Sequence, residues 1–197
     1  MANDGCAWSR GNALLRQYHD TEWGVPVHDD ALLFEHLALE VMQCGLNWLL
    51  MLKKREIFRS ALAGFDPQRL ASFTEADIEA ALAEPGMIRS RRKVEALIAN
   101  ARAFLDIQKT FGSFHAWLWS FTDGRVLIYE SHAGAVPASN ALSDRISAEL
   151  KKRGFRYVGS ITLYSMLQAC GIINDHDPTC PRFREVLDGA EVTRIAE

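Results

Sequence analysis

The sequence predicts an all-α protein. Apolar residues recur at helical spacing through most of the 197 residues, capping residues and helix-ending glycines separate these stretches, and one short segment alone has strand character. With 48% hydrophobic and 24% charged residues, a chain of this length is expected to form one domain spanning residues 1–197 around a sizeable core.

In the first half of the chain, caps and periodicity agree. Leu33, Leu37 and Val41 repeat at helical spacing after an aspartate cap, and an apolar and then basic helix follows Gly45. Asp66 precedes a proline, the residue favoured at the first helical position, and the next helix opens at a threonine with acids in its first turn. The expected helices cover residues 29–46, 47–62, 66–73 and 74–84.

The second half is also helical, with one exception. A long helix is expected over 90–112, a short apolar one over 113–121 containing the core residues Trp117 and Trp119, and two more over 141–154 and 159–171. The exception is "GRVLIY", which is expected to form a strand but has no obvious partner strand. Residues 133–140 are expected to form a loop that ends in a cap.

Charge and cysteine usage indicate the compartment. The net charge of −3 argues against a protein that is basic all over, no apolar run is long enough to span a membrane, and the N-terminal residues are too polar for a signal peptide. Cys44 and Cys170 lie in apolar helical patterns and are expected in the core, and the spread of all the cysteines argues against a disulfide framework. We expect a reduced, cytoplasmic protein.

The two remaining cysteines suggest a metal site. His176 and Cys180 are four residues apart near the C-terminus, and Cys6 and His19 lie in an N-terminal segment with little helical pattern. Together they would form a closed tetrahedral Cys2His2 site of the structural zinc type, tying one end of the chain to the other. The alternative is that His176 is a cation at a helix end and Cys180 a free thiol.

Aromatic residues gather around these four positions. Trp8, Tyr18, Trp23 and Trp48 flank the possible ligands or open the second helix. Tryptophan is usually a core residue, but aromatic residues crowded into an irregular, glycine-containing segment more often line a pocket for a flat ligand.

Glu40 is the unusual residue of its helix, because apolar residues surround it. It lies either at the edge of the buried face, which is the commoner case, or inside as an acid awaiting a partner. Gln43 follows three residues later on the same side of the helix. An acid, an amide and aromatic rings suit a nucleobase, above all a positively charged one.

Three basic islands interrupt the mildly acidic chain, at 53–59, 89–93 and 151–156. Each alone is typical of a solvated helix end. The second follows a Pro-Gly turn, so backbone N–H groups at the helix start could bind a DNA phosphate while side chains neutralise its neighbours. The candidate DNA-binding residues are Gly86, Arg89, Arg91, Arg92 and Lys93.

The chain resembles the 3-methyladenine DNA glycosylase I family of base-excision repair enzymes. The resemblance runs from Cys6 to about Cys180, through "CAW", "YHDTEWGVP", "LEVMQCGLNW" followed by "LKKRE", "GMIRSRRK", "KKRGFRYVG" and "MQACGIINDHDPTC". It implies a helix-hairpin-helix glycosylase fold with a hairpin element at about 75–108. It also implies a structural zinc ion bound by residues in about 1–25 and 172–185.

The resemblance assigns roles to the candidate residues. The zinc ligands would be Cys6, His19, His176 and Cys180. Glu40 would accept hydrogen bonds from the flipped base, Trp48 and Tyr18 would contact it, and Trp8 and Trp23 would complete the aromatic wall. The implied reaction is hydrolysis of the N-glycosidic bond of N3-methyladenine in alkylated double-stranded DNA, leaving an abasic site. No Schiff base, no catalytic aspartate and no obligate protein partner are implied, and we expect a monomer.

Two positions in the expected pocket depart from the family pattern. Asn47 stands where the family usually has serine, and Leu50 where it usually has threonine. Asn47 is expected to add bulk and an amide beside Trp48, and Leu50 removes a hydroxyl, so both are expected to affect substrate preference.

Two other functions are compatible with the sequence. A zinc-stabilised DNA-binding protein of the same fold could hold flipped bases without cleaving them, and measuring base release would distinguish it. The His-Asp pairs at 19–20 and 176–177 suggest a metal-dependent phosphohydrolase, but two cysteines among four protein ligands leave no open position for water.

Overall fold

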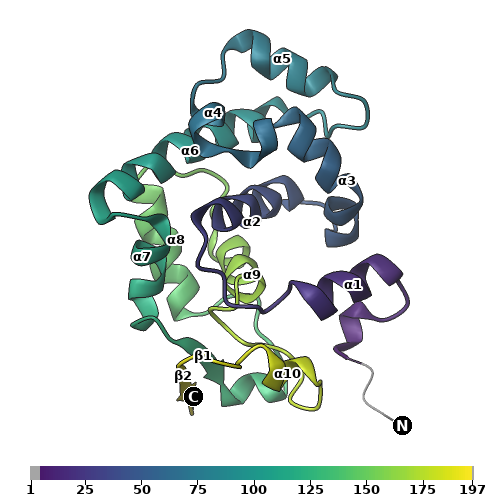
Figure 1. The fold of residues 1–197 in the computed structure, drawn as a ribbon, viewed down its shortest axis with the longest axis vertical. Helices are drawn as coiled ribbons and strands as arrows, with labels where there is room; N and C mark the ends of the chain where they lie inside the picture. The colour runs from purple at the N-terminus through teal and green to yellow at the C-terminus, as the bar shows by residue number, and fades with distance from the viewer. Residues whose placement is uncertain (1–4, 197) are drawn as a thin grey trace.

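The computed structural model describes residues 5–196 and is mostly helical (Figure 1). The helices are α1 (Ala13–Thr21), α2 (Asp30–Gln43), α3 (Trp48–Ala61), α4 (Pro67–Ala71), α5 (Glu75–Ala83), α6 (Arg91–Phe111), α7 (Phe114–Trp119), α8 (Ala141–Lys152), α9 (Ser160–Ala169) and α10 (Arg182–Glu185). The strands are β1 (Val126–Tyr129) and β2 (Val192–Ile195). Residues 1–4 and 197 of the single domain expected from the sequence lie outside the described residues.

Helix α2 is the centre of the molecule. Every residue from Leu33 to Met42 is buried, as expected for a helix covered on all sides. Figure 1 shows α4, α5 and α6 above α2, α7 and α8 on one side, and α9 below it. Both described ends of the chain reach the lower part of the molecule, near α1, α10 and the strands. A side chain on the lower face of α2 therefore points toward the region where the two ends meet.

The caps expected from the sequence are confirmed. The Asp29 side chain accepts from Leu32 N at 2.9 Å, and Asp66 caps α4 with Pro67 at its first position. Thr74 forms a capping box at the start of α5, and Gly112 ends α6 with a positive φ. These local signals explain why most helix boundaries could be predicted.

Two expectations were wrong, one about the N-terminal segment and one about the isolated strand. The N-terminal segment contains helix α1, which is amphipathic and is capped by the Asn12 side chain. The strand at "VLIY" has a partner: β1 pairs in parallel with β2, with Val126 opposite Val192. The second strand is short and mostly exposed, so its sequence carries little strand signal.

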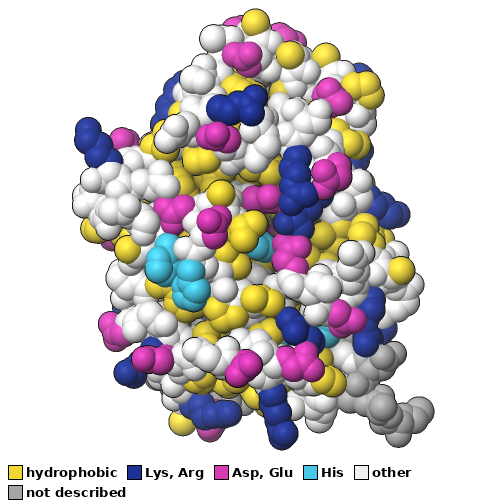
Figure 2. Space-filling view, in the orientation of Figure 1, with side chains coloured by type: hydrophobic (Ala, Val, Ile, Leu, Met, Phe, Trp, Pro, Cys, Tyr) yellow, Lys and Arg dark blue, Asp and Glu magenta, His cyan; other side chains and the backbone are white. Residues whose placement is uncertain are grey.

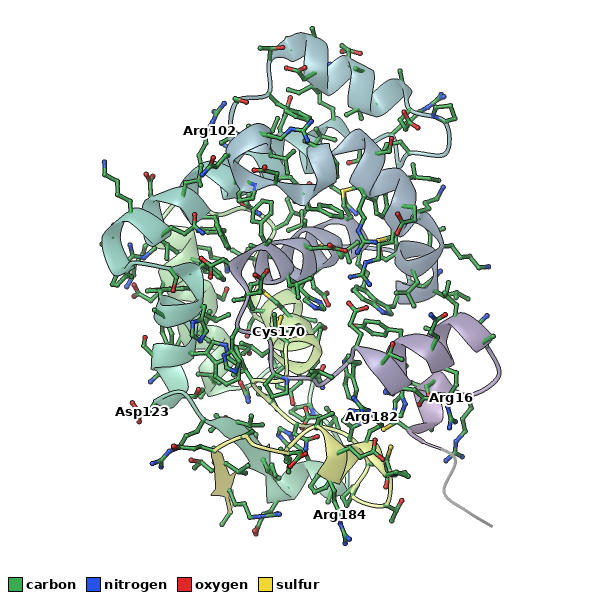
Figure 3. The ribbon with its side chains drawn as sticks, in the orientation of Figure 1. Arg16, Arg102, Asp123, Cys170, Arg182 and Arg184 are labelled. Carbon is green, nitrogen blue, oxygen red and sulfur yellow. The ribbon has the colours of Figure 1, made fainter. Side chains whose placement is uncertain are left out.

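The expected core residues are mostly confirmed. Trp117 and Trp119 are buried, and Cys170 lies in the interior at the C-terminal end of α9 (Figure 3). Cys44 is an exception, because it is half-buried at the C-cap of α2. None of the helices in residues 5–196 is long and apolar enough to cross a membrane.

Charges of both signs are interspersed on the face shown in Figure 2, with hydrophobic side chains between them. Part of the basic island at 53–59 is used inside the protein. Arg55 donates to Glu22 and Glu35 at 2.6 Å, and Arg59 donates to the same Glu35 at 2.7 Å. This network joins α3 to α2 and to the end of α1, so it stabilises the fold rather than offering these guanidinium groups to a ligand.

Gly171 allows the segment after α9 to contact the chain just after α1. It has a φ of +68°, and a Cβ there would lie 2.5 Å from Pro26 N and from Val25 C. Val27 N donates to Cys170 O at 3.0 Å in the same contact. A side chain at residue 171 would therefore push apart two backbones that are hydrogen-bonded to each other.

Gly171→Ala is expected to destabilise the protein by well over the 1–2 kcal/mol that a left-handed non-glycine residue costs by itself. Gly112→Ala is the matched control, since Gly112 has a φ of +87° but a Cβ added there would meet no atom within 4 Å. Thermal unfolding of both variants measures the difference. Equal losses of stability would show that the backbone contact at Gly171 is unimportant.

Candidate base-binding cavity and metal cluster

Cys6, His19, His176 and Cys180 meet in one buried cluster. Their ligand atoms all lie within 4.8 Å of one another. Cys6 Sγ is 3.5 Å from His176 Nδ1, and Cys180 Sγ is 3.5 Å from His19 Nε2. The cluster could hold a metal ion, and the spacing that suggested it from the sequence corresponds to a real convergence of the two chain ends.

Neighbouring groups fix both histidine rings. Asp20 Oδ1 lies 2.7 Å from His19 Nδ1, which leaves Nε2 facing the cluster. His176 Nε2 lies 3.1 Å from Trp23 O, which leaves Nδ1 facing the cluster. Gly24 makes this approach possible, because a Cβ there would lie 2.7 Å from His176 Nε2. Such second contacts are typical of metal-binding histidines, since they select the ring nitrogen that binds.

The cluster supports an aromatic wall. The Trp23 ring packs edge-on against His176, with centroids 4.6 Å apart, and the Trp8 ring packs against His19 at 5.5 Å. Trp8 and Trp23 also contact each other at 5.0 Å. The position of the two tryptophan rings therefore depends on the position of the two histidines.

The wall encloses a cavity of about 280 Å³ between α1, α2, α3 and α9. Tyr18 and Trp48 also line it, with ring centroids 5.2 Å apart, and the Tyr18 ring lies 6.3 Å from that of Trp8. The residues that line the cavity are Trp8, Tyr18, Trp23, Glu40, Gln43, Trp48, Val136, Ser165, Gln168 and Asp175. A cavity lined by several aromatic rings suits a flat heterocycle.

Glu40 supplies the cavity with a buried carboxyl group. The residue is 5% exposed, and within residues 5–196 its side chain makes no hydrogen bond or ion pair with another protein group. Desolvation by burial raises its pKa from 4.5 to about 8. Of the two alternatives that the sequence left open, the structure therefore favours the buried acid without a protein partner. Such a group has a strong electrostatic preference for a cation.

Several residues of the wall were not among the candidates. Ser165 and Gln168 belong to α9, Asp175 follows it, and Val136 comes from the loop before α8. Gln168 and Asp175 lie within the "MQACGIINDHDPTC" segment, but nothing in their spacing indicates that they face a cavity. The packing of α9 against α2 brings them into the same cavity wall as Glu40.

Asn47 has a different position from the one expected. Its side chain accepts from Leu50 N at 2.9 Å and caps α3, and neither Asn47 nor Leu50 lines the cavity. Serine and asparagine are nearly equivalent as N-caps. The expectation that the two departures fall in the pocket was therefore wrong: Asn47 keeps the local role that serine could fill, and Leu50 packs against the core.

Lys93 was also expected in a different role. Its side chain is buried, and its Nζ donates to Met42 O at 2.6 Å and to Cys44 O at 2.7 Å. It satisfies carbonyl groups at the C-terminus of α2, where a cation is favourable. Lys93 therefore holds the turn between α2 and α3 and is not available for a DNA phosphate.

The other DNA-binding candidates are at the surface. Arg91 is ion-paired with Glu75 at 2.7 Å and with Glu79, so its charge is compensated within the protein. Arg89 and Arg92 are at least partly exposed, and Gly86 O accepts from the Lys54 ammonium group. Of the basic side chains at this turn, Arg89 and Arg92 remain the candidates for contact with DNA.

The described residues form a helical domain whose aromatic cavity contains a buried acid without a protein partner, an arrangement suited to a flat, cationic heterocycle. The methyladenine glycosylase family matches residues 8–184 of this chain. The chain is 42% identical over 176 residues to DNA-3-methyladenine glycosylase 1 of Escherichia coli (strain K12), covering 89% of this chain and 94% of that protein. The chain belongs to the methyladenine glycosylase family.

Solved structures of 3-methyladenine DNA glycosylase I have the same fold as this chain. A crystal structure of 3-methyladenine DNA glycosylase I superposes with a TM-score of 0.85 at 44% identity, covering 90% of this chain and 98% of the other. The Staphylococcus aureus enzyme, studied for its recognition of 3-methyladenine, superposes with a TM-score of 0.86 at 35% identity, covering 92% and 97%. The predicted glycosylase fold is confirmed.

Glu40→Gln is expected to make stability less dependent on pH. Because the folded protein raises the Glu40 pKa from 4.5 to about 8, the folded state holds a proton that the unfolded state releases. This contribution to stability is fully present below pH 4.5 and is lost as the pH rises through 8, by a few kcal/mol. The variant should therefore gain in melting temperature over the wild type as the pH rises from about 5 to about 9. Parallel curves would mean that Glu40 is ionised in the free protein at neutral pH.

Proposed function

We propose that this protein is a base-excision repair glycosylase that hydrolyses the N-glycosidic bond of N3-methyladenine in alkylated double-stranded DNA. The observation that carries the proposal is Glu40, a buried carboxyl group that faces an aromatic cavity and has no partner in the described protein. Membership of the methyladenine glycosylase family supports the same activity.

Glu40 would distinguish the damaged base from ordinary adenine by charge. Methylation at N3 leaves the base cationic while it is attached to the sugar, and a desolvated carboxylate attracts a cation far more than a neutral base. A methyl group alone would give only about 1–3 kcal/mol of discrimination. Because the Glu40 pKa is about 8 in the empty cavity, entry of the cation would favour ionisation and release a proton.

The aromatic residues would hold the base in place. Trp8, Tyr18, Trp23 and Trp48 all line the cavity, and their rings contact one another in the order Trp23, Trp8, Tyr18, Trp48. Stacking of the cation on these rings would add a cation–π attraction of about 0.5–2 kcal/mol. This term has the same sign as the attraction to Glu40, so both favour the methylated base.

The reaction needs little acid catalysis. The bond between the sugar C1′ and N9 breaks, and its electron pair neutralises the positive charge of the departing base. A water oxygen bonds to C1′ and loses one proton, which leaves an abasic site. The protein's task is to extrude the base, bind its charge and let water reach the sugar.

The DNA would approach over a groove next to the cavity. The groove is lined by residues at the end of α2 and the start of α9, and it shares Glu40, Gln43 and Ser165 with the cavity. Two apolar side chains are exposed there, Leu46 and Ile161. This arrangement would allow a nucleotide to pass from the surface to Glu40.

Two hairpins could contact the DNA backbone. The one between α5 and α6 carries Arg89 and Arg92, within the element expected at 75–108. The other joins α8 to α9, and we assign the main phosphate contact to it because α9 itself lines the cavity. Gly159, the N-cap of α9, has no side chain to accept hydrogen bonds from the first turn of the helix. The backbone N–H groups of that turn could therefore bind a phosphate.

The buried cluster would hold one structural zinc ion. A tetrahedral ion with ordinary bond lengths to nitrogen and sulfur would put these ligand atoms about 3.6 Å apart. Three of the four Sγ–N distances in the cluster are 3.5 Å, 3.5 Å and 4.0 Å, and all ligand atoms lie within 4.8 Å of one another, so the residues fit. With four protein ligands there is no open position for water, which favours a structural role over a catalytic one.

Wild-type protein is expected to release free 3-methyladenine from methylated duplex DNA, and Glu40→Gln should lower the single-turnover rate by at least about tenfold. The substitution keeps the shape of the side chain and removes its charge. Affinity for undamaged duplex should change little, because Glu40 lies inside the cavity. Released bases are measured by chromatography, and duplex affinity by fluorescence anisotropy.

Glu185→Gln provides a matched control, since this glutamate lies on α10 and does not line the cavity. It should excise the base at the wild-type rate. A wild-type protein that binds DNA and free 3-methyladenine but releases no base would instead be a base-holding protein without hydrolase activity.

Removal of the metal is expected to unfold the region around both chain ends. Cys180→Ser should lower the metal content and the melting temperature together, because metal-binding free energy is part of the folding free energy. Cys44→Ser, at the half-buried end of α2, should leave the metal content unchanged. Elemental analysis and thermal unfolding test this, and a metal-free but fully folded wild-type protein would contradict it.

A further inference from the structure

The hairpin between α8 and α9 contains a residue in an unfavourable backbone conformation. Tyr157 has a φ of +58°, in the left-handed region that a bulky side chain rarely adopts. Its side chain is 41% exposed, so burial of the ring does not account for this conformation. Such a residue persists where the surrounding structure holds the backbone in place. Contacts made by its neighbours must therefore hold the hairpin in this shape.

Asn100 of α6 holds the residue that precedes Tyr157. Asn100 is fully buried, and both ends of its amide bond to the backbone of Arg156. Oδ1 accepts from Arg156 N at 2.7 Å, and Nδ2 donates to Arg156 O at 3.0 Å. An N–H group facing Oδ1 and a carbonyl facing Nδ2 fix the orientation of the amide. Because the two bonds reach both peptide groups of one residue, they determine how the backbone enters Tyr157.

Other contacts to the hairpin come from α8. Phe155 N donates to Leu150 O at 3.1 Å, and Ser147 Oγ donates to Val158 O at 2.6 Å. Helix α8 runs directly into the hairpin, so these bonds lie within one local unit. Asn100 is 56 residues away from Arg156 in the sequence. It therefore ties the hairpin to a helix of which the hairpin is not a continuation.

The next residues of the hairpin have backbone donors without a partner. Within residues 5–196, the N–H groups of Tyr157, Val158 and Gly159 make no hydrogen bond. Successive free N–H groups in a turn of this kind form a concavity that binds anions. Arg156 N, the donor just before them, is the one that Asn100 holds from inside the protein. The position of the free donors therefore depends on Asn100.

We propose that Asn100 is a positioning residue for DNA binding. Through the backbone of Arg156 it holds the hairpin at 153–159 in the shape that directs the free N–H groups of Tyr157, Val158 and Gly159 toward one DNA phosphate. The proposal rests on the proposed function, from which it takes the phosphate contact at this hairpin. Without Asn100, Tyr157 can relax to an ordinary φ, and the three N–H groups no longer converge.

Asn100→Ala removes both hydrogen bonds without adding volume. We expect it to weaken binding to undamaged duplex DNA by about tenfold or more, as measured by fluorescence anisotropy. Affinity for free 3-methyladenine, measured by quenching of tryptophan fluorescence, should stay at the wild-type value, because the hairpin does not line the cavity. The DNA concentration that gives half the maximal rate of base release should rise, and the rate at saturating DNA should not fall.

Gln108→Ala is the matched control on the same helix. Gln108 Nε2 donates to Asp30 Oδ2 at 2.7 Å, so this variant breaks a hydrogen bond between α6 and the start of α2 instead. It should lower the melting temperature and keep the wild-type affinity for duplex DNA. Equal losses of duplex affinity in the two variants would overturn the proposal. So would a loss of 3-methyladenine binding in Asn100→Ala that matches its loss of DNA binding, since both results indicate a general structural role.

Asn100→Asp nearly keeps the shape of the side chain and allows rescue by pH. As a carboxylate it still accepts from Arg156 N but repels Arg156 O, and once protonated it can donate to that oxygen. Burial favours the protonated form, so the ratio of its duplex affinity to that of the wild type should rise as the pH falls from about 8 to about 5. A reduced ratio that does not change with pH would overturn the proposal.

Binding to undamaged duplex requires no excision and separates this inference from the proposed function. If wild-type protein binds duplex DNA but releases no base, and Asn100→Ala loses the DNA binding, the inference stands without the hydrolase. If wild-type protein excises the base and Asn100→Ala binds duplex DNA with wild-type affinity, the hydrolase stands and the inference is overturned.

Discussion

The approach of Cys6 and His19 to His176 and Cys180 is the constraint on which the site depends. It holds α1 and the segment before it against the chain that follows α9. The Trp8 and Trp23 rings pack directly on the two histidines, so the aromatic wall takes its position from the cluster. Gly24 and Gly171 serve the same convergence, because side chains at either position would collide with the other end of the chain.

The second feature of the site is a compromise between folding and binding. Helix α2 is buried on all sides, which gives Glu40 a rigid position and removes it from water. Burial raises the pKa of the carboxyl group to about 8, a free-energy cost that an apolar side chain would avoid. The cost is compatible with a ligand that brings a positive charge, since pairing then offsets the lost hydration. A stable fold alone gives no reason to keep an acid here.

The polar groups of the cavity wall differ in how freely they can adjust. Glu40 responds to charge, and its protonation state can adjust to the ligand. Gln168 is held by Asp175, which is held by Tyr164 and His132, so its polarity cannot adjust. Two polar side chains outside the cavity hold the turn between α2 and α3: Asn47 caps α3, and Lys93 of α6 donates to carbonyl groups at the end of α2.

The sequence by itself determined the helical class, most helix boundaries and the identity of the four cluster residues, because caps, periodicity and residue type are local properties. It also singled out Glu40, since an acid within an apolar pattern is visible without a structure. Only the tertiary structure decided that Lys93 points inward, that Asn47 lies outside the cavity, that β1 has a partner in β2, and that Gln168 and Asp175 line the same cavity as Glu40. These facts depend on contacts between segments far apart in the chain, and no local pattern encodes which side chains such contacts bring together.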